Sequence, residues 1–236
     1  MTRTYGSQMG FEMVGADSVG DSAFQNLNLT DADVQFFPSF LAPADSDRLF
    51  EELLRCANWK QEKIRWYGKQ LELPRLTAWY GDEGKVYKYS GIIVEPDPWI
   101  RPLIEIKEKI EAVSGTRFNS VLLNLYRTGR DSVSWHSDDE PELGELPTIG
   151  SVSLGQTRPF HMRHKRDKSL RATVELTHGS FLLMKGTTQN CWIHEIPKSA
   201  RSLRPRINLT FRDIKESADR RARRNPKGAL PEAGIG

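Results

Sequence analysis

One short stretch, SWHSDDE at Ser134–Glu140, places a histidine beside three acidic side chains, directly after a strand-like run. His136 and Asp138 are two residues apart, so in an extended segment both side chains project from the same face. From there they can bind one metal ion at adjacent coordination positions. His194, in the later run NCWIHEIP, can supply a third ligand. An isolated H-x-D triplet is also common in polar turns, so the metal hypothesis needs support from other residues.

A late strand, RPRINLTFR, alternates apolar and polar residues, which therefore lie on opposite faces. The apolar face has Ile207, Leu209 and Phe211, and the polar face has Arg206, Asn208, Thr210 and Arg212. The arginines lie either in water on a surface strand or in the interior beside a bound anion. A buried guanidinium without a partner costs several kcal/mol. The alternation alone leaves both interpretations open.

Together, the triad and the arginines favour one kind of chemistry. Two histidines and a carboxylate form the facial triad of non-haem Fe(II) oxygenases, which leaves coordination positions open. A dicarboxylate such as 2-oxoglutarate would be the anion, with its far carboxylate paired in a bidentate manner to Arg206. Asn124 and Tyr126, on one face of LLNLYRTG, offer an amide and a hydroxyl to the same ligand.

Composition predicts a globular protein that is neither secreted nor embedded in a membrane. Of the 236 residues, 38% are apolar and 28% charged, and the apolar runs are short. No secretory signal is recognisable near residue 1. Two cysteines, Cys56 and Cys191, are too few for a disulfide framework, which favours a reducing cytoplasm. The net charge of +3 and the basic clusters at 163–171, 198–206 and 218–228 permit a nucleic-acid partner, although such clusters are often only solvated.

The order of elements predicts one α+β domain over residues 31–214, with disordered tails at 1–30 and 215–236. Residues 31–115 would hold two helices and a nucleotide-recognition segment. The first helix begins near Pro43, and the second follows Pro98, has Val113 on its apolar stripe and ends at Gly115. Residues 116–214 contain seven strand-like runs without an intervening helix, which is typical of an antiparallel sandwich or barrel.

In combination, these motifs resemble the AlkB family of Fe(II)- and 2-oxoglutarate-dependent dioxygenases. The matching set is N-x-Y at Asn124/Tyr126, H-x-D at His136/Asp138, His194, and R-x-N-x-x-x-R at Arg206/Asn208/Arg212. PRLTAWYGD, YKYSG and SVSLGQTRPFHMRHK are similar to its nucleic-acid repair branch, so the resemblance runs from about residue 74 to residue 212. It implies a double-stranded β-helix, or jelly roll, with N-terminal helices outside the larger sheet.

The resemblance also implies roles for these residues. His136, Asp138 and His194 would hold Fe(II), and Arg206, Asn124, Tyr126 and Asn208 would bind 2-oxoglutarate. Arg212 would contact the other end of the cosubstrate or Asp138. With O2, such an enzyme oxidises N-alkyl groups on bases such as 1-methyladenine and 3-methylcytosine and releases aldehyde, succinate and CO2. The reaction centre would need no catalytic residue beyond the metal ligands.

The substrate side of the resemblance rests on shorter matches. A reacting base must leave its stack, and Tyr89, with Tyr87 and Ser90 in YKYSG, would hold it, unless the tyrosines are ordinary core residues. Trp66 and Tyr67 would fill the vacated stack, Arg75 would lie near the opposite strand, and Arg163, Lys165 and Arg166 would meet phosphates. Glu140 would favour a base made cationic by methylation.

The predicted partner is alkylated DNA, possibly RNA, and the predicted state is a cytoplasmic monomer without an obligate protein partner. Several alternatives stay open. One is an oxygenase that acts on RNA, a protein or a small molecule, which would not need the aromatic and basic surround. A jelly roll that binds nucleic acid without turnover would not need the triad with both arginines. A zinc hydrolase would leave these arginines unexplained.

Overall fold

Two antiparallel sheets face each other in the computed structural model, which describes residues 24–66, 69–85, 87–89 and 92–215. The larger sheet has the strand order β1 (Gln25–Asn26), β2 (Asp33–Phe37), β13 (Ser180–Lys185), β10 (Ile149–Gly155), β15 (Arg206–Arg212), β8 (Ser120–Tyr126) and β5 (Leu76–Gly81). The smaller sheet has the order β12 (Arg171–Leu176), β11 (Arg158–His164), β14 (Trp192–Ile196) and β9 (Val133–His136). Strands remote in sequence thus become neighbours, and the predicted α+β jelly roll is confirmed.

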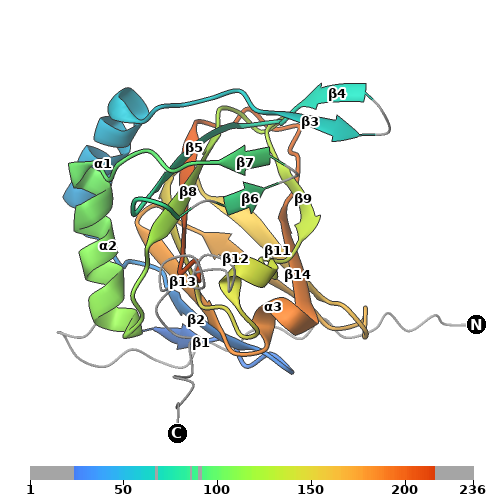
Figure 1. Ribbon diagram of the computed structural model, residues 1–236. Helices are drawn as coiled ribbons and strands as arrows, with labels where there is room; N and C mark the ends of the chain where they lie inside the picture. Colours follow the sequence, from blue (N-terminus) through green and yellow to red (C-terminus); the bar gives the residue numbers. More distant parts are fainter. Residues whose placement is uncertain (1–23, 67–68, 86, 90–91, 216–236) are drawn as a thin grey trace, which may run out of the picture.

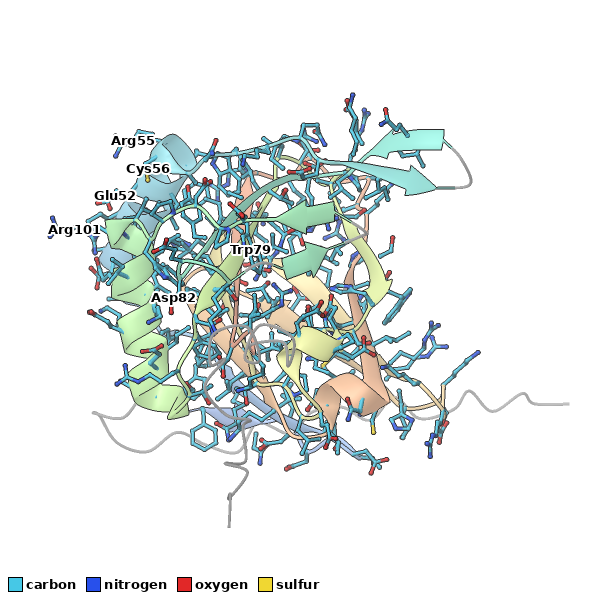
Figure 2. The ribbon with its side chains drawn as sticks, in the orientation of Figure 1. Glu52, Arg55, Cys56, Trp79, Asp82 and Arg101 are labelled. Atoms are coloured by element: carbon cyan, nitrogen blue, oxygen red, sulfur yellow. The ribbon has the colours of Figure 1, made fainter. Side chains whose placement is uncertain are left out.

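Two helices cover the outer face of the larger sheet (Figure 1). They are α1 (Pro43–Cys56) and α2 (Arg101–Ser114), and both start where the prolines predict. Gly115 ends α2 in a left-handed conformation with φ 66°, which glycine adopts without a steric penalty. Their outward side carries charged residues such as Glu52, Arg55 and Arg101 (Figure 2). None of the described helices has the length and apolar character needed to cross a membrane.

Two hairpins lie outside the sheets. The hairpin of β3 (Lys63–Trp66) and β4 (Lys69–Glu72) projects on the side away from the helices, and that of β6 (Tyr87–Tyr89) and β7 (Ile92–Val94) lies nearer the middle of the molecule (Figure 1). A 3₁₀ turn, η1 (Pro141–Leu143), and a short helix, α3 (Thr188–Cys191), interrupt the strand region.

Some predicted boundaries are wrong. Residues 25 and 26 form β1, and Leu27 is buried, so residues 24–30 belong to the folded domain rather than to a tail. Val113 is 46% exposed and lies outside the packed stripe of α2. The strand predicted at NCWIHEI begins two residues later than expected, at Trp192, because Asn190 and Cys191 belong to α3.

The interior is divided by the larger sheet into two apolar clusters. One lies between this sheet and the helices and includes Leu49, Leu53 and Ile106. The other lies between the two sheets and includes Phe160 and Met162. The second cluster is interrupted by polar side chains, and these form the candidate site.

A candidate metal and oxoacid site

Three side chains of the predicted triad converge between the sheets. His136 in β9 is paired with His194 in β14, and Asp138 follows β9 directly. One ligand atom from each residue lies within 4.8 Å of the ligand atoms of the other two. Imidazole and carboxylate ligands suit Fe(II). The donor set is therefore chemically appropriate for the predicted metal.

An irregularity in β9 orients His136. The register shifts between the pairs His194–His136 and Ile196–Val133, so that three steps along β9 oppose two along β14. Such a bulge redirects a side chain beside a functional site. The carbonyl of Ser134 then lies 2.8 Å from Nδ1 of His136 and can accept its proton, which leaves the Nε2 lone pair for a metal.

The other two members of the triad are also held by neighbours. The Asp138 amide donates to Oε1 of Gln189 in α3 at 3.0 Å. The ring of His194 stacks on Phe160, with 4.9 Å between ring centroids. Gln189 was missed from the sequence, because no spacing connects this residue with a carboxylate 51 positions earlier.

Charge keeps the buried ligands in the protonation states that metals require. Burial alone would raise the pKa of Asp138, but Arg212, His194 and His136 together outweigh this effect and lower it well below the usual range. Nη2 of Arg212 donates to Oδ1 of Asp138 at 2.6 Å. Burial, with the neighbouring His136, lowers the pKa of His194 to about 3. At neutral pH, Asp138 is therefore ionised and His194 is neutral.

Arg206 provides the strongest evidence for an anion-binding site. It is 1% exposed, and Nη2 donates to Oγ of Ser153 at 2.9 Å. Its buried Nε and Nη1 have no hydrogen-bond partner within the described residues. Burial lowers the pKa of Arg206 only to about 10, so it stays cationic at neutral pH. A cation with unused donors fits a carboxylate, whose two oxygens can pair with it.

Arg206 and the triad line one cleft, together with the other residues predicted for the cosubstrate. Asn124 accepts a hydrogen bond from Nε of Arg75 through Oδ1, at 2.7 Å. Asn208 donates to Oγ of Ser151 at 2.8 Å. The lining residues are Arg75, Leu122, Asn124, Tyr126, Val133, His136, Asp138, Ser151, Phe160, Leu176, Met184, His194, Ile196, Arg206, Asn208, Thr210 and Arg212.

The position of Arg75 contradicts one prediction. It was expected near the opposite strand of a nucleic acid, but it is 3% exposed and lies inside the cleft. Besides Asn124, it donates to the carbonyl of Ser132 at 3.2 Å. Of the two roles predicted for Arg212, the structure shows the contact with Asp138.

The predicted substrate residues are placed only in part. Trp66 lies in β3, and Tyr87 and Tyr89 lie in β6, but only their backbone is described. Tyr67 and Ser90 fall outside the described residues.

Four further residues that were predicted to contact the substrate lie near β9 and β11. Glu140 lies two residues after Asp138, and its buried Oε2 has no hydrogen-bond partner in the described part of the chain. The guanidinium of Arg163 stacks on Trp135, 4.5 Å from the ring centroid. Lys165 donates to Oδ2 of Asp139 at 2.9 Å, so its charge is already paired, whereas Arg166 is exposed.

A second group with metal-binding side chains contains Asp31, His164 and Cys191. Nδ1 of His164 accepts the amide proton of Asp167 at 3.0 Å. In a neutral imidazole the ring proton is then on Nε2, which lies 3.5 Å from Oδ2 of Asp31. A protonated nitrogen cannot bind a metal, so this tautomer disfavours a second metal centre.

Comparisons with known proteins agree with this site. Residues 33–212 match the 2OG-Fe(II) oxygenase superfamily. The alpha-ketoglutarate-dependent dioxygenase alkB homolog 3 of Bos taurus is 45% identical over 186 residues, which cover 75% of this chain and 64% of that protein. The chain therefore spans less than two thirds of that relative. The DNA oxidative demethylase ALKBH2 of Mus musculus is 41% identical over 181 residues, which cover 72% of this chain and 76% of that protein.

A solved structure, that of OsALKBH1, shares the fold. Its TM-score is 0.57 at 16% identity, with 81% of this chain and 100% of that chain covered. At this identity the likeness concerns the fold alone. The family requires Fe(II), 2-oxoglutarate and O2, and the His136, Asp138 and His194 set beside the buried Arg206 suits the first two. From its matched domain and its relatives, the chain belongs to the AlkB family of the 2OG-Fe(II) oxygenase superfamily.

Proposed function

We propose that this protein removes N-alkyl groups oxidatively from damaged bases in DNA, such as 1-methyladenine and 3-methylcytosine. The observation that carries the proposed oxygenase activity is the buried Arg206, whose unused donors lie in the same cleft as the triad. The DNA substrate is supported by a relative named as a DNA oxidative demethylase, which is 41% identical.

In the proposed reaction each residue has a defined task. His136, Asp138 and His194 hold the iron, and Arg212 keeps Asp138 ionised. Arg206 binds the distal carboxylate of 2-oxoglutarate. When bound, iron, O2 and 2-oxoglutarate together supply the oxidant: one oxygen atom enters succinate as CO2 leaves, and the other hydroxylates the N-methyl carbon. The hydroxymethyl group of the cationic base then leaves as formaldehyde: its hydroxyl proton passes to solvent, and the base nitrogen keeps the electron pair of the broken C–N bond.

Recognition of the damaged base would combine charge and stacking. Methylation at a Watson–Crick nitrogen makes adenine or cytosine cationic, so the Glu140 carboxylate would attract the damaged base more strongly than the normal one. Its unpartnered Oε2 supports this role. Base flipping costs roughly a few kcal/mol, and Trp66 and Tyr67 would offset part of this cost by filling the vacated stack.

Turnover on methylated oligonucleotides tests the proposal. The protein, reconstituted anaerobically with Fe(II), receives 2-oxoglutarate, O2 and a strand with 1-methyladenine or 3-methylcytosine. We expect formaldehyde and repaired base in equal amounts with DNA. Matched RNA strands and unmethylated DNA serve as comparisons. Succinate formation without repair of any methylated strand would refute the nucleic-acid substrate while leaving the oxygenase intact.

The proposed filling of the vacated stack is tested separately with single-stranded and double-stranded DNA. We expect Tyr67→Ala to weaken repair of the duplex only, because a single strand has no opposite stack to fill. Equal losses on both substrates would exclude Tyr67 as a residue that fills the vacated stack.

The cytoplasmic location and the monomeric state stay predictions. Cell fractionation tests the first, and light scattering of the purified protein tests the second.

A further inference from the structure

Another buried arginine, Arg158 at the start of β11, lies close to the oxoacid cleft. It is 1% exposed and does not line the cleft. Its guanidinium lies 5.6 Å from the centroid of the Tyr126 ring, and the guanidinium of Arg206 lies 5.1 Å from the same centroid. Tyr126 does line the cleft and is itself only 2% exposed. One aromatic ring therefore contacts two buried cations, a favourable arrangement for each contact taken singly.

The hydrogen bonds of Arg158 do not neutralise its charge. Nη2 donates to the carbonyls of Asp131 and Pro197 at 3.1 and 2.6 Å, and Nη1 donates to the carbonyl of Thr128 at 3.4 Å. The Asp131 carboxylate pairs instead with Arg127, whose Nε lies 2.7 Å from Oδ2. Nε of Arg158 has no hydrogen-bond partner in the described part of the chain.

Two cations that share one ring in the interior make each other less favourable. Burial lowers the pKa of Arg158, against the smaller opposing effects of Tyr126 and Asp131. At Arg206, burial lowers the pKa first, and the charge of Arg158 lowers it further. Without an anion, this repulsion between two like charges is unfavourable. The pair becomes favourable when an anion with two negative charges occupies the cleft, because both cations then attract it.

We infer that Arg158 is a positioning residue for the cosubstrate. It holds the Tyr126 ring against Arg206 and adds a second positive charge near the distal carboxylate of 2-oxoglutarate. This inference rests on the cosubstrate site of the proposed function but not on the nucleic-acid substrate. It gives the site a preference for oxoacids with a distal carboxylate over metal chelators, such as oxalate, that lack one.

A purely structural role makes a different prediction. The three carbonyls bound by Arg158 belong to the segment between β8 and β9 and to the segment after β14. These segments also contact each other, since the Ser199 amide donates to the carbonyl of Gly129 at 2.7 Å. If Arg158 served only to join them, its loss would disturb the nearby metal ligands and weaken every ligand of the cleft alike.

Ligand binding without turnover separates the two roles. The affinities for 2-oxoglutarate and oxalate are measured by calorimetry on protein loaded with Mn(II), which replaces Fe(II) without oxidation. Oxalate can chelate the metal but has no distal carboxylate. Arg158→Gln keeps an amide donor for the carbonyls and removes the charge, and Arg158→Lys keeps the charge. Arg171→Met, at an exposed position of the same sheet, is the matched control.

For Arg158→Gln we expect 2-oxoglutarate to bind about tenfold more weakly, because one partly screened charge interaction is lost. Oxalate binding should be unchanged. Arg158→Lys should recover most of the affinity, and Arg171→Met should bind both ligands normally. Should Arg158→Gln not fold, Arg158→Met provides a second neutral variant. Equal losses for both ligands, or no loss for either, would overturn the inference, whatever the enzyme does with DNA.

Discussion

The two faces of β15 are both buried, yet they differ completely in chemistry. All seven residues of the strand are buried. Ile207, Leu209 and Phe211 pack into the cluster beneath the helices. On the opposite face, Arg206 and Arg212 point between the sheets, where the second apolar cluster is interrupted by the cleft.

This difference separates stability from function within one strand. The apolar face gains free energy on burial without any partner beyond the surrounding side chains. The polar face buries cations whose desolvation is unfavourable until an anion or a metal-bound carboxylate neutralises them. Arg212 meets that need within the chain through Asp138, whereas Arg206 forms no ion pair among the described residues and, in the proposed function, meets it through 2-oxoglutarate.

The largest effect on turnover should come from the proposed metal ligands, which line the same cleft as the polar face of β15. We expect Asp138→Ala to reduce turnover by about a thousandfold or more, since even changes outside the ligand set often cost about 10- to 100-fold. The measurement is succinate formation together with bound iron per chain. Iron binding at the unsubstituted level would show that Asp138 is not a ligand.

On the apolar face, Leu209→Ala should act on stability alone. A fully buried leucine leaves a cavity when truncated, which costs about 2–5 kcal/mol of unfolding free energy. Urea denaturation measures this loss. Folded Leu209→Ala protein should bind 2-oxoglutarate as well as the unsubstituted protein, and a much weaker affinity would mean that the two faces are not independent.

Arg206→Met should have the opposite profile. Removing a buried cation with unused donors should leave the ligand-free fold unchanged or stabilise it by about 1–4 kcal/mol. The rise in Tm that 2-oxoglutarate gives the metal-loaded protein should disappear. Thermal unfolding with and without 2-oxoglutarate measures both effects. A strongly destabilised variant would indicate that Arg206 has a structural role instead.

The smallest effect on stability should come from an ionic contact in α2, on the apolar side of β15. Glu111 in α2 accepts the Phe118 amide at 2.7 Å and pairs with Lys107 at 3.1 Å. Burial alone would raise the pKa of Glu111, but the Phe118 amide and Lys107 lower it on balance. The ionised form therefore stabilises the fold above the unfolded-state pKa, and this contribution is lost as the pH falls through the lower folded-state pKa.

Glu111→Gln should accordingly cost about 1 kcal/mol at neutral pH. Chemical denaturation at several pH values should show this difference shrinking in acid. A difference that is constant with pH would argue that the charge of Glu111 is irrelevant.

The sequence predicted the elements whose patterns are local. The stripe of α1, the glycine after α2 and the alternation in β15 each follow from spacing within a few residues. The H-x-D, H and R-x-N-x-x-x-R motifs identified the triad and both arginines because each motif carries its own chemistry.

What the sequence did not predict depends on contacts between remote segments. Gln189 reaches Asp138 only because α3 packs beside it, and Arg75 lies inside the cleft only because β5 pairs with β8. Arg158 did leave a signal. It shares its strand face with Phe160 and Met162, so the alternation of β11 already places a charge on the inward face.

Anaerobic titration with Fe(II) and 2-oxoglutarate tests the central claim most directly, with visible absorption reporting chelation of the iron by the oxoacid. We expect one iron and one 2-oxoglutarate per chain, and an absorption band that requires both. The band should be absent in Asp138→Ala and should form less readily in Arg206→Met. Binding of 2-oxoglutarate that is equally strong without metal and in Arg206→Met would contradict it.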